Sequence, residues 1–98
     1  MPDYLLLMHN DATEPERDED WGAYLALLRG SGKFDGGSAI GTGVCVRKSG
    51  VAPSIASHLT GFLRVNAEDL EEAVRLVAGN PVYETGGTVE IRELPRTG

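Results

Sequence analysis

Apolar residues, in short runs or alternating with polar ones, mark four segments of the chain as β-strands. The first is Asp3–His9, an apolar run whose side chains would point to opposite faces: Tyr4, Leu6 and Met8 to one, and Leu5 and Leu7 to the other. A strand that is apolar on both faces is covered by two layers.

The segment that follows predicts an amphipathic helix. Thr13, Pro15 and Glu16 have the spacing of a capping box with Thr13 as the N-cap. Apolar residues then recur at i, i+3, i+4 and i+7, as on one helix face: Trp21, Tyr24, Leu25 and Leu28. Gly30 or Gly32 is expected to end this helix.

Two strands are expected in the middle of the chain, on either side of a turn region that contains Pro53. The earlier one is Gly43–Ser49, in which Cys45, the single cysteine, would be a buried strand residue rather than a nucleophile. The later one lies within residues 56–66, whose alternation gives two faces: His58, Thr60, Phe62 and Arg64 on one, and Leu59, Leu63 and Val65 on the other.

A second helix and a final strand complete the pattern. Asn66 is the expected N-cap, with Asp69 three residues later, and Gly79 and Pro81 are stop signals. The apolar stripe of this helix is Leu70, Ala73, Val74 and Val77. The segment Thr88–Leu94 alternates apolar and polar residues and predicts a half-buried strand.

The order βαββαβ within one domain, residues 1–98, predicts an α+β, ferredoxin-like fold: a four-stranded antiparallel sheet with both helices on one face. The other face of such a sheet should be polar, yet the first strand is apolar on both faces and Phe62 points outward. Exposed apolar patches usually mark interfaces. We therefore expect a homodimer in which two sheets pack face to face as a dimeric α+β barrel.

The composition and charge limit the classes of partner that we expect. The 98 residues are 41% hydrophobic, with no apolar run long enough to span a membrane and no leader peptide, so a cytoplasmic protein is expected. The net charge of -6 is concentrated in residues 11–20. This acidic segment is either the start of a helix or a docking site for a cationic partner or metal. Without a basic stripe, nucleic-acid binding is not expected.

The glycine-rich segment Arg29–Gly43 raises the question of a phosphate site. It lacks the GxxxxGK[ST] spacing and follows a helix instead of a strand, so no nucleotide cofactor is expected. Gly36 and Gly37 fit a bulged or bent strand to which another backbone or a ligand comes close. His9 and Asp11 have no second pair of ligands at a recognisable spacing, so no metal site is expected either.

The candidate catalytic residues begin with the two histidines, whose unperturbed pKa lies near neutrality. The antiparallel order brings His9, His58 and Thr88 to one edge of the sheet, with Asp11 and Glu14 nearby. A histidine beside a carboxylate can act as a general base, while an arginine binds an anionic substrate: Arg47, Arg64 or Arg92. A histidine in a strand can equally have only a structural or interface role.

A small-molecule pocket is expected beneath the first helix and around the glycine pair. Its predicted lining is Trp21, Tyr24, Gly36, Gly37, Ser38 and Arg64. At helical spacing, Trp21 and Tyr24 also fit a role in the core.

Four stretches resemble the YCII-related proteins, including their DGPF branch: YLLLMHND, GKFDGGSAI, GFLRVNAEDLEEAVRLVAGNP and TVEIREL. The resemblance covers nearly the whole chain and implies a ferredoxin-like dimeric α+β barrel in a family whose members mostly have no assigned reaction. Some relatives are associated with dehydrochlorination or lactone-type chemistry, for which a His and Asp pair has been proposed.

The family's helix histidine would fall near Trp21, and Asp35 or Ser38 would take the place of the partner acid. The DGPF tetrapeptide is replaced by VAPSIAS, Val51–Ser57. Because an aromatic residue, Trp21, stands where the family has its helix histidine, the acid and base roles would have to move to His9 or His58. Asp35 is accordingly a third candidate catalytic residue.

Three functions are compatible with these features. The first is a homodimer with a cleft for a small aromatic or carboxylated molecule, whose reaction, if it has one, is unassigned. The second is a cofactor-independent lyase or isomerase with a histidine general base. The third is a structural or interaction domain without catalysis.

Overall fold

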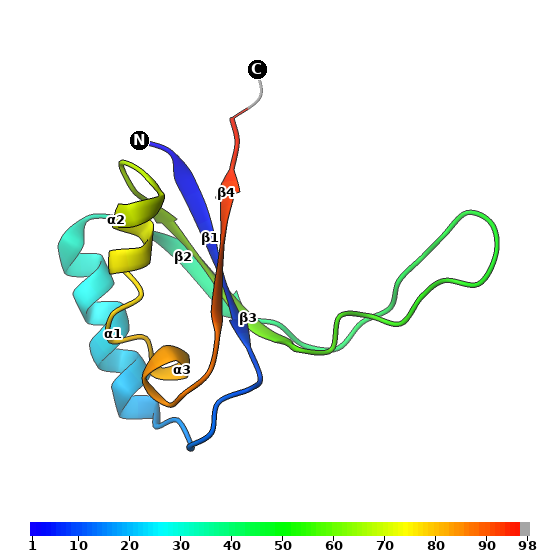
Figure 1. Ribbon diagram of the computed structural model, residues 1–98, viewed down its shortest axis with the longest axis horizontal. Coiled ribbons are helices and arrows are strands. Elements are labelled where there is room, and N and C mark those ends of the chain that lie inside the picture. The colour runs from blue at the N-terminus through cyan, green and yellow to red at the C-terminus, as the bar shows by residue number, and fades with distance from the viewer. Residues whose placement is uncertain (97–98) are drawn as a thin grey trace.

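The computed structural model describes residues 1–96 and has two layers, an antiparallel sheet and helices on one of its faces (Figure 1). The elements are β1 (Asp3–His9), α1 (Asp18–Ser31), β2 (Phe34–Ala39), β3 (Leu59–Asn66), α2 (Leu70–Arg75), α3 (Pro81–Glu84) and β4 (Val89–Leu94). The strand order is β2-β3-β1-β4, and every pairing is antiparallel. This confirms the predicted ferredoxin-like α+β fold, to which α3 adds one short helix.

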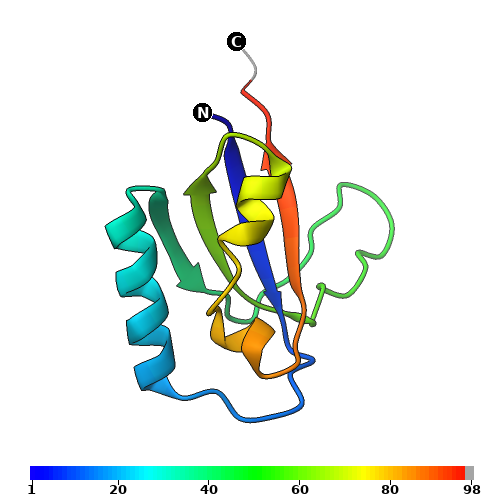
Figure 2. The ribbon, with the colours of Figure 1, turned by 60° about the vertical axis from the view of Figure 1, so that its left-hand side comes forward.

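The core lies between the helices and the sheet (Figure 2). The central strand β1 places Leu6 opposite Leu63 of β3 and Ile91 of β4, so alternate residues of all three strands face the helices. The buried apolar residues are Tyr4, Leu6, Met8, Tyr24, Leu28, Leu63, Val65, Ala67, Ala73, Val77 and Val82. Each large side chain buried there contributes about 1.5–3 kcal/mol.

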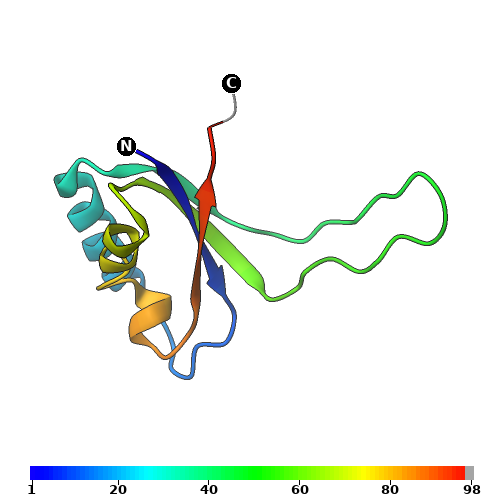
Figure 3. The same ribbon diagram turned by 45° about the horizontal axis from the view of Figure 1, so that its top comes forward.

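The opposite face of the sheet, the open face, carries half-buried Leu5, Leu7 and Phe62 among charged residues. No helix or strand of residues 1–96 covers it (Figure 3). The predicted division of β1 into two apolar faces is thus confirmed. Of the helices in the described part of the chain, none has the length and apolar character needed to cross a membrane.

The predicted capping box of the first helix is wrong. The helix begins at Asp18, and its N-cap Arg17 makes no side-chain cap. Thr13 instead donates its hydroxyl to the carbonyl of Thr85, 3.1 Å away. Three acidic residues in the first turn complement the helix dipole without a cap. The end of the helix is confirmed at Gly32, whose φ of 73° is left-handed.

The strand predicted at Gly43–Ser49 is also wrong, because β2 lies earlier, at Phe34–Ala39. Gly36, with φ of 99°, and an irregular register between Phe34 and Gly37 bend this strand, as the bulge interpretation expected. Residues 40–58 form a long loop, the arm, which contains Cys45 outside any strand. The arm projects away from the sheet on the side opposite the helices (Figures 1 and 3).

The N-cap of α2 is Asp69, not Asn66 as predicted. Asp69 accepts a hydrogen bond from the backbone N–H of Glu72, at 2.9 Å. Asn66 ends β3 and donates its side-chain amide to Asp3. The predicted apolar stripe is only half buried, with Ala73 and Val77 in the core and Leu70 and Val74 exposed.

Candidate functional site

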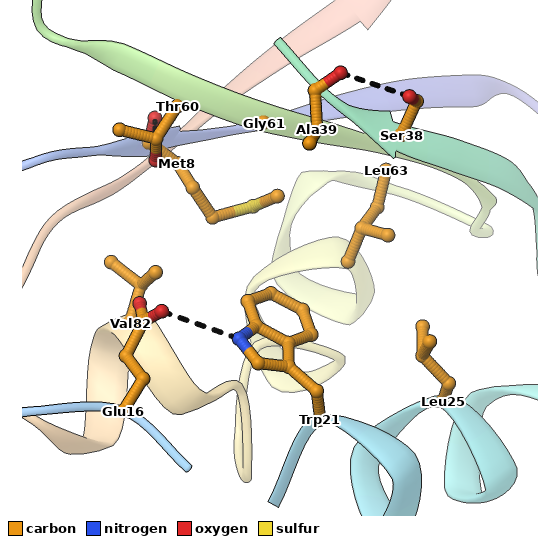
Figure 4. A pocket seen from close by; sticks show the side chains of 10 residues that line it. All are labelled: Met8, Glu16, Trp21, Leu25, Ser38, Ala39, Thr60, Gly61, Leu63 and Val82. Carbon is orange, nitrogen blue, oxygen red and sulfur yellow. Dashed lines mark hydrogen bonds between the residues drawn. The ribbon is translucent and has the colours of Figure 1, made fainter. Parts of the chain in front are cut away.

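A cleft of about 330 Å³ opens between α1, α3 and the helix face of the sheet (Figure 4). Its volume lies at the lower end of the range typical of small-molecule sites. It is lined by Met8, Glu16, Trp21, Leu25, Ser38, Ala39, Thr60, Gly61, Leu63 and Val82. The cleft is therefore shaped by three strands and two helices that are distant in the sequence.

The walls of the cleft are mostly apolar. Met8 and Leu63 point down from the sheet toward the indole of Trp21, which rises from the first turn of α1 (Figure 4). Gly61 keeps the sheet side open, since a Cβ there would lie 3.2 Å from Cε of Met8 and from the carbonyl of Ser38. Aromatic and aliphatic side chains are typical of the walls of small-molecule sites.

The polar groups of the cleft are few and lie at its margins. The Trp21 indole N–H donates to Oε2 of Glu16, 3.4 Å away. The hydroxyls of Ser38 and Thr60 donate to the backbone carbonyls of Ala39 and Met8. Glu16 is the only charged residue in this lining, so a second carboxylate placed in the cleft would find no cationic partner among these residues.

A second cluster, the histidine cluster of His9, His58 and Glu90, lies at the end of β1. Nε2 of His9 lies 2.9 Å from Oε1 of Glu90 on the neighbouring strand β4. The His58 ring meets the His9 ring edge to face, with centroids 4.8 Å apart. Hydrogen bonds from His9 and then Arg92 hold the pKa of the Glu90 carboxyl below its usual range.

The predicted gathering of His9, His58, Thr88 and Asp11 at this edge is confirmed. The backbone N–H of His9 donates to the carbonyl of Thr88, and that of Asn10 donates to the carbonyl of His58. Asp11 accepts from both the N–H and the hydroxyl of Thr88, at 2.8 and 2.6 Å, which lowers the pKa of its carboxyl.

The cleft and the histidine cluster do not share residues. β1 points Met8 into the cleft and the next residue, His9, toward Glu90, because successive strand side chains alternate between faces. A general base at His9 would therefore act on a molecule at the open face, not in the cleft.

Of the residues predicted to line a pocket, Trp21 and Ser38 line the cleft. Tyr24 is a core residue, 2% exposed, whose hydroxyl donates to the carbonyl of Leu76 at 2.7 Å. Gly36 and Gly37 lie beside the cleft in β2 but outside its lining, and Arg64 lies on the open face.

Asp35 does not join the histidines. Its Oδ2 lies 3.3 Å from Nε of Arg64, and Arg64 also reaches buried Asp3 at 3.2 Å. This ion-pair network occupies the end of β3 opposite to His58. The structure thus separates the three candidate catalytic residues into a histidine pair and a distant carboxylate.

Three residues of the cleft and the histidine cluster were not identified from the sequence: Glu90, Val82 and Glu16. Glu90 alternates outward on β4, but only the strand register pairs it with His9. Val82 and Glu16 reach the cleft because α3 and the segment before α1 pack at its end, and nothing in the sequence pattern indicated α3. Within residues 1–96, no three His, Cys, Asp or Glu side chains are grouped to hold a metal ion.

A search of solved structures finds similarity to TftG, the 5-chloro-2-hydroxyhydroquinone dehydrochlorinase of Burkholderia phenoliruptrix AC1100, in complex with 2,5-dihydroxybenzoquinone. The TM-score is 0.56 at 17% identity, over 97% of this chain and 95% of that one. The likeness shows the shared fold. A scan against protein-family models finds no match. A search of curated proteins finds none either.

Proposed function

We propose that the protein is a YCII-like homodimer that binds a small, neutral, hydroxylated aromatic molecule in the cleft. The observation that carries this proposal is the lining itself, with an indole and aliphatic side chains around a space of about 330 Å³ and a carboxylate at the margin. Glu16 is suited to accept a hydrogen bond from a phenolic hydroxyl. A benzoate would instead bring a second carboxylate to it.

Two further observations support the proposal. The fold is shared with a dehydrochlorinase whose structure holds 2,5-dihydroxybenzoquinone, a hydroxylated six-membered ring. The stretches that resemble YCII-related proteins imply a family in which some relatives are associated with dehydrochlorination. Half-buried Leu5, Leu7 and Phe62 on the open face support the homodimer.

The test uses the single tryptophan of the chain, which lies in the cleft. Hydroquinone and its carboxylated counterpart, 2,5-dihydroxybenzoate, are titrated while the Trp21 indole N–H resonance is followed by NMR. We expect hydroquinone to shift this resonance with a dissociation constant of about 0.1–1 mM, and the benzoate to bind about tenfold more weakly.

The matched variants are Ala39→Leu, which fills the cleft, and Ala26→Leu, on the exposed surface of α1. Binding should be lost in the first and kept in the second. Equal binding by both variants, or no shift with either compound, would contradict the proposal.

A cofactor-independent lyase or isomerase is a second candidate, favoured by the pair of His9 and Glu90. A carboxylate bonded to an imidazole fixes its tautomer and stabilises the imidazolium after proton transfer. Arg92 lies on the same face, with Nη1 3.2 Å from Oε2 of Glu90, and is the arginine placed to hold a substrate anion there. Side-chain NMR of His9 and His58 against aromatic acids and lactones tests it. We expect a ligand to shift the His9 or His58 resonances, and Glu90→Gln to abolish that shift. If no compound of the panel shifts either resonance, this reaction is excluded.

A further inference from the structure

The arm carries the three most exposed large apolar side chains of residues 1–96. Val44, Val46 and Val51 are 84%, 92% and 90% exposed. No backbone hydrogen bond joins two residues within 41–57, and the turn at the tip is closed by one contact, from Arg47 Nη1 to the carbonyl of Val51 at 3.2 Å. Extended apolar chain with free backbone groups is a surface that another chain can cover.

The charge of the arm indicates what that chain is. The arm contains two basic residues, Arg47 and Lys48, and no acidic one, so the rest of the chain has seven basic and fifteen acidic residues. The arm is therefore complementary to the body of a second copy. The acidic residues are densest in the segment 11–20, which holds six of them and one arginine.

The arm and the open face lie on the same side of the sheet, away from the helices (Figures 1 and 3). From Ile40 to the tip the chain runs about nine residues, or about 30 Å when extended. Sheets packed face to face are about 10 Å apart, and a helix layer adds about as much again. The tip would thus pass the second copy's sheet and reach its helix layer.

The base of the arm and the segment 11–20 lie at one end of the sheet, where the backbone of Asn10 bonds to His58. A two-fold axis along the strands would bring these ends of two copies together. We infer that the two arms clasp a homodimer, with open faces packed together and Arg47 and Lys48 of each copy bound to the segment 11–20 of the other. This inference rests on the homodimer proposed above.

Zero-length carbodiimide crosslinking of a mixture of ¹⁴N- and ¹⁵N-labelled chains tests the clasp. The two lysines of the chain report different contacts. Lys48 should link to carboxylates within 11–20 in mixed-isotope pairs, whereas Lys33, whose Nζ lies 3.0 Å from Glu72, should link to it within single chains. The Lys33 link is the internal control.

The possible results separate the two claims. Mixed-isotope links from Lys48 to 11–20 support the clasp. A dimer in light scattering whose Lys48 forms no such links, while the control link forms, overturns the clasp alone. A monomer at micromolar concentration overturns both the clasp and the homodimer. Ligand binding in the cleft is tested separately, by the hydroquinone titration.

Charge-neutralising variants give a second measurement. Arg47→Gln with Lys48→Gln should raise the dimer dissociation constant about tenfold, an effect that shrinks as salt rises. Arg29→Gln with Arg75→Gln removes the same charge from the exposed surfaces of α1 and α2 and should leave the constant unchanged. Equal constants for the two double variants would overturn the clasp.

Discussion

His9 and Glu90 meet across neighbouring strands, with Nε2 of the imidazole 2.9 Å from Oε1 of the carboxylate. The hydrogen bond from His9 is the first cause of the lowered pKa of Glu90, and Arg92 adds to it. A carboxyl with a lowered pKa stabilises the fold above its unfolded pKa, and this stability is lost as pH falls through the folded value.

We therefore predict that replacing His9 by Asn raises the pKa of the Glu90 carboxyl toward its usual value. NMR titration of the Glu90 side-chain carboxyl carbon measures this directly. The part of the stability difference that is due to Glu90 should begin to shrink as pH falls below about 4.5, the usual carboxyl pKa, and disappear only once pH is below the lowered pKa of Glu90, where its carboxyl is protonated in the folded protein too. A Glu90 titration unchanged by the substitution would contradict the assigned cause.

Gly37 and Gly30 provide a matched pair for the role of the glycine segment. A Cβ at Gly37 would lie 2.5 Å from the carbonyl oxygen of Phe62 and 2.6 Å from Cδ2 of Leu63, whereas one at Gly30 meets nothing within 4 Å. Gly37→Ala should destabilise the fold by about 1–3 kcal/mol, because β2 must move away from β3. Gly30→Ala, inside α1, should stabilise it by about 0.5–1 kcal/mol.

Urea unfolding of both variants measures these free energies. The changes in unfolding free energy should have opposite signs. This distinguishes the contact at Gly37 from a general destabilisation by any glycine substitution. Destabilisation by both variants to the same extent would show that the contact with Phe62 is not the cause.

The same contact explains why β2 could not be predicted. Its residues FDGGSA lack apolar alternation, and the strand forms because Gly37 lets two backbones approach. The segment Gly43–Ser49 has a strand-like pattern, yet lies in the arm and pairs with nothing in residues 1–96. The strands β1, β3 and β4 and the helix α1 were predictable because burial of one face imposes a period on their sequences.

Asn80 links the stability of α3 to the shape of the cleft. It is fully buried, and its Oδ1 accepts hydrogen bonds from the backbone N–H groups of Val82 and Tyr83. Asn80→Ala removes the cap and should destabilise the protein by about 1–2 kcal/mol. Asn80→Ser keeps an N-cap oxygen and should recover part of the loss.

Thermal unfolding of the two variants measures the difference. Since Val82 lines the cleft, the alanine variant should also weaken hydroquinone binding while the serine variant largely retains it. Identical melting temperatures for the two variants would argue against capping by Asn80.

The histidine cluster and the cleft were each predictable in part, since Trp21 and Ser38 were expected at a pocket and line the cleft. Antiparallel order alone puts His9 beside His58, whereas the partner Glu90 depends on the register between β1 and β4. A cap residue illustrates the same limit: Asn66 and Asp69 are both good N-caps three residues apart. The long-range bond from Asn66 to Asp3 decides between them.

The role of Asp35 distinguishes two possible ligand sites. The resemblance to YCII-related proteins gives Asp35 the place of a partner acid, whereas the cleft does not include it. Its side chain is 58% exposed and bonds to Arg64 on the open face, outside the lining of the cleft. Asp35→Ala should therefore change stability by at most about 1 kcal/mol, as expected for an exposed ion pair.

Hydroquinone should still shift the Trp21 resonance of the Asp35→Ala variant with an unchanged dissociation constant. Glu16→Gln should weaken binding severalfold, because it replaces the acceptor carboxylate. Loss of binding in Asp35→Ala with retention in Glu16→Gln would move the ligand site from the cleft to the edge of β2.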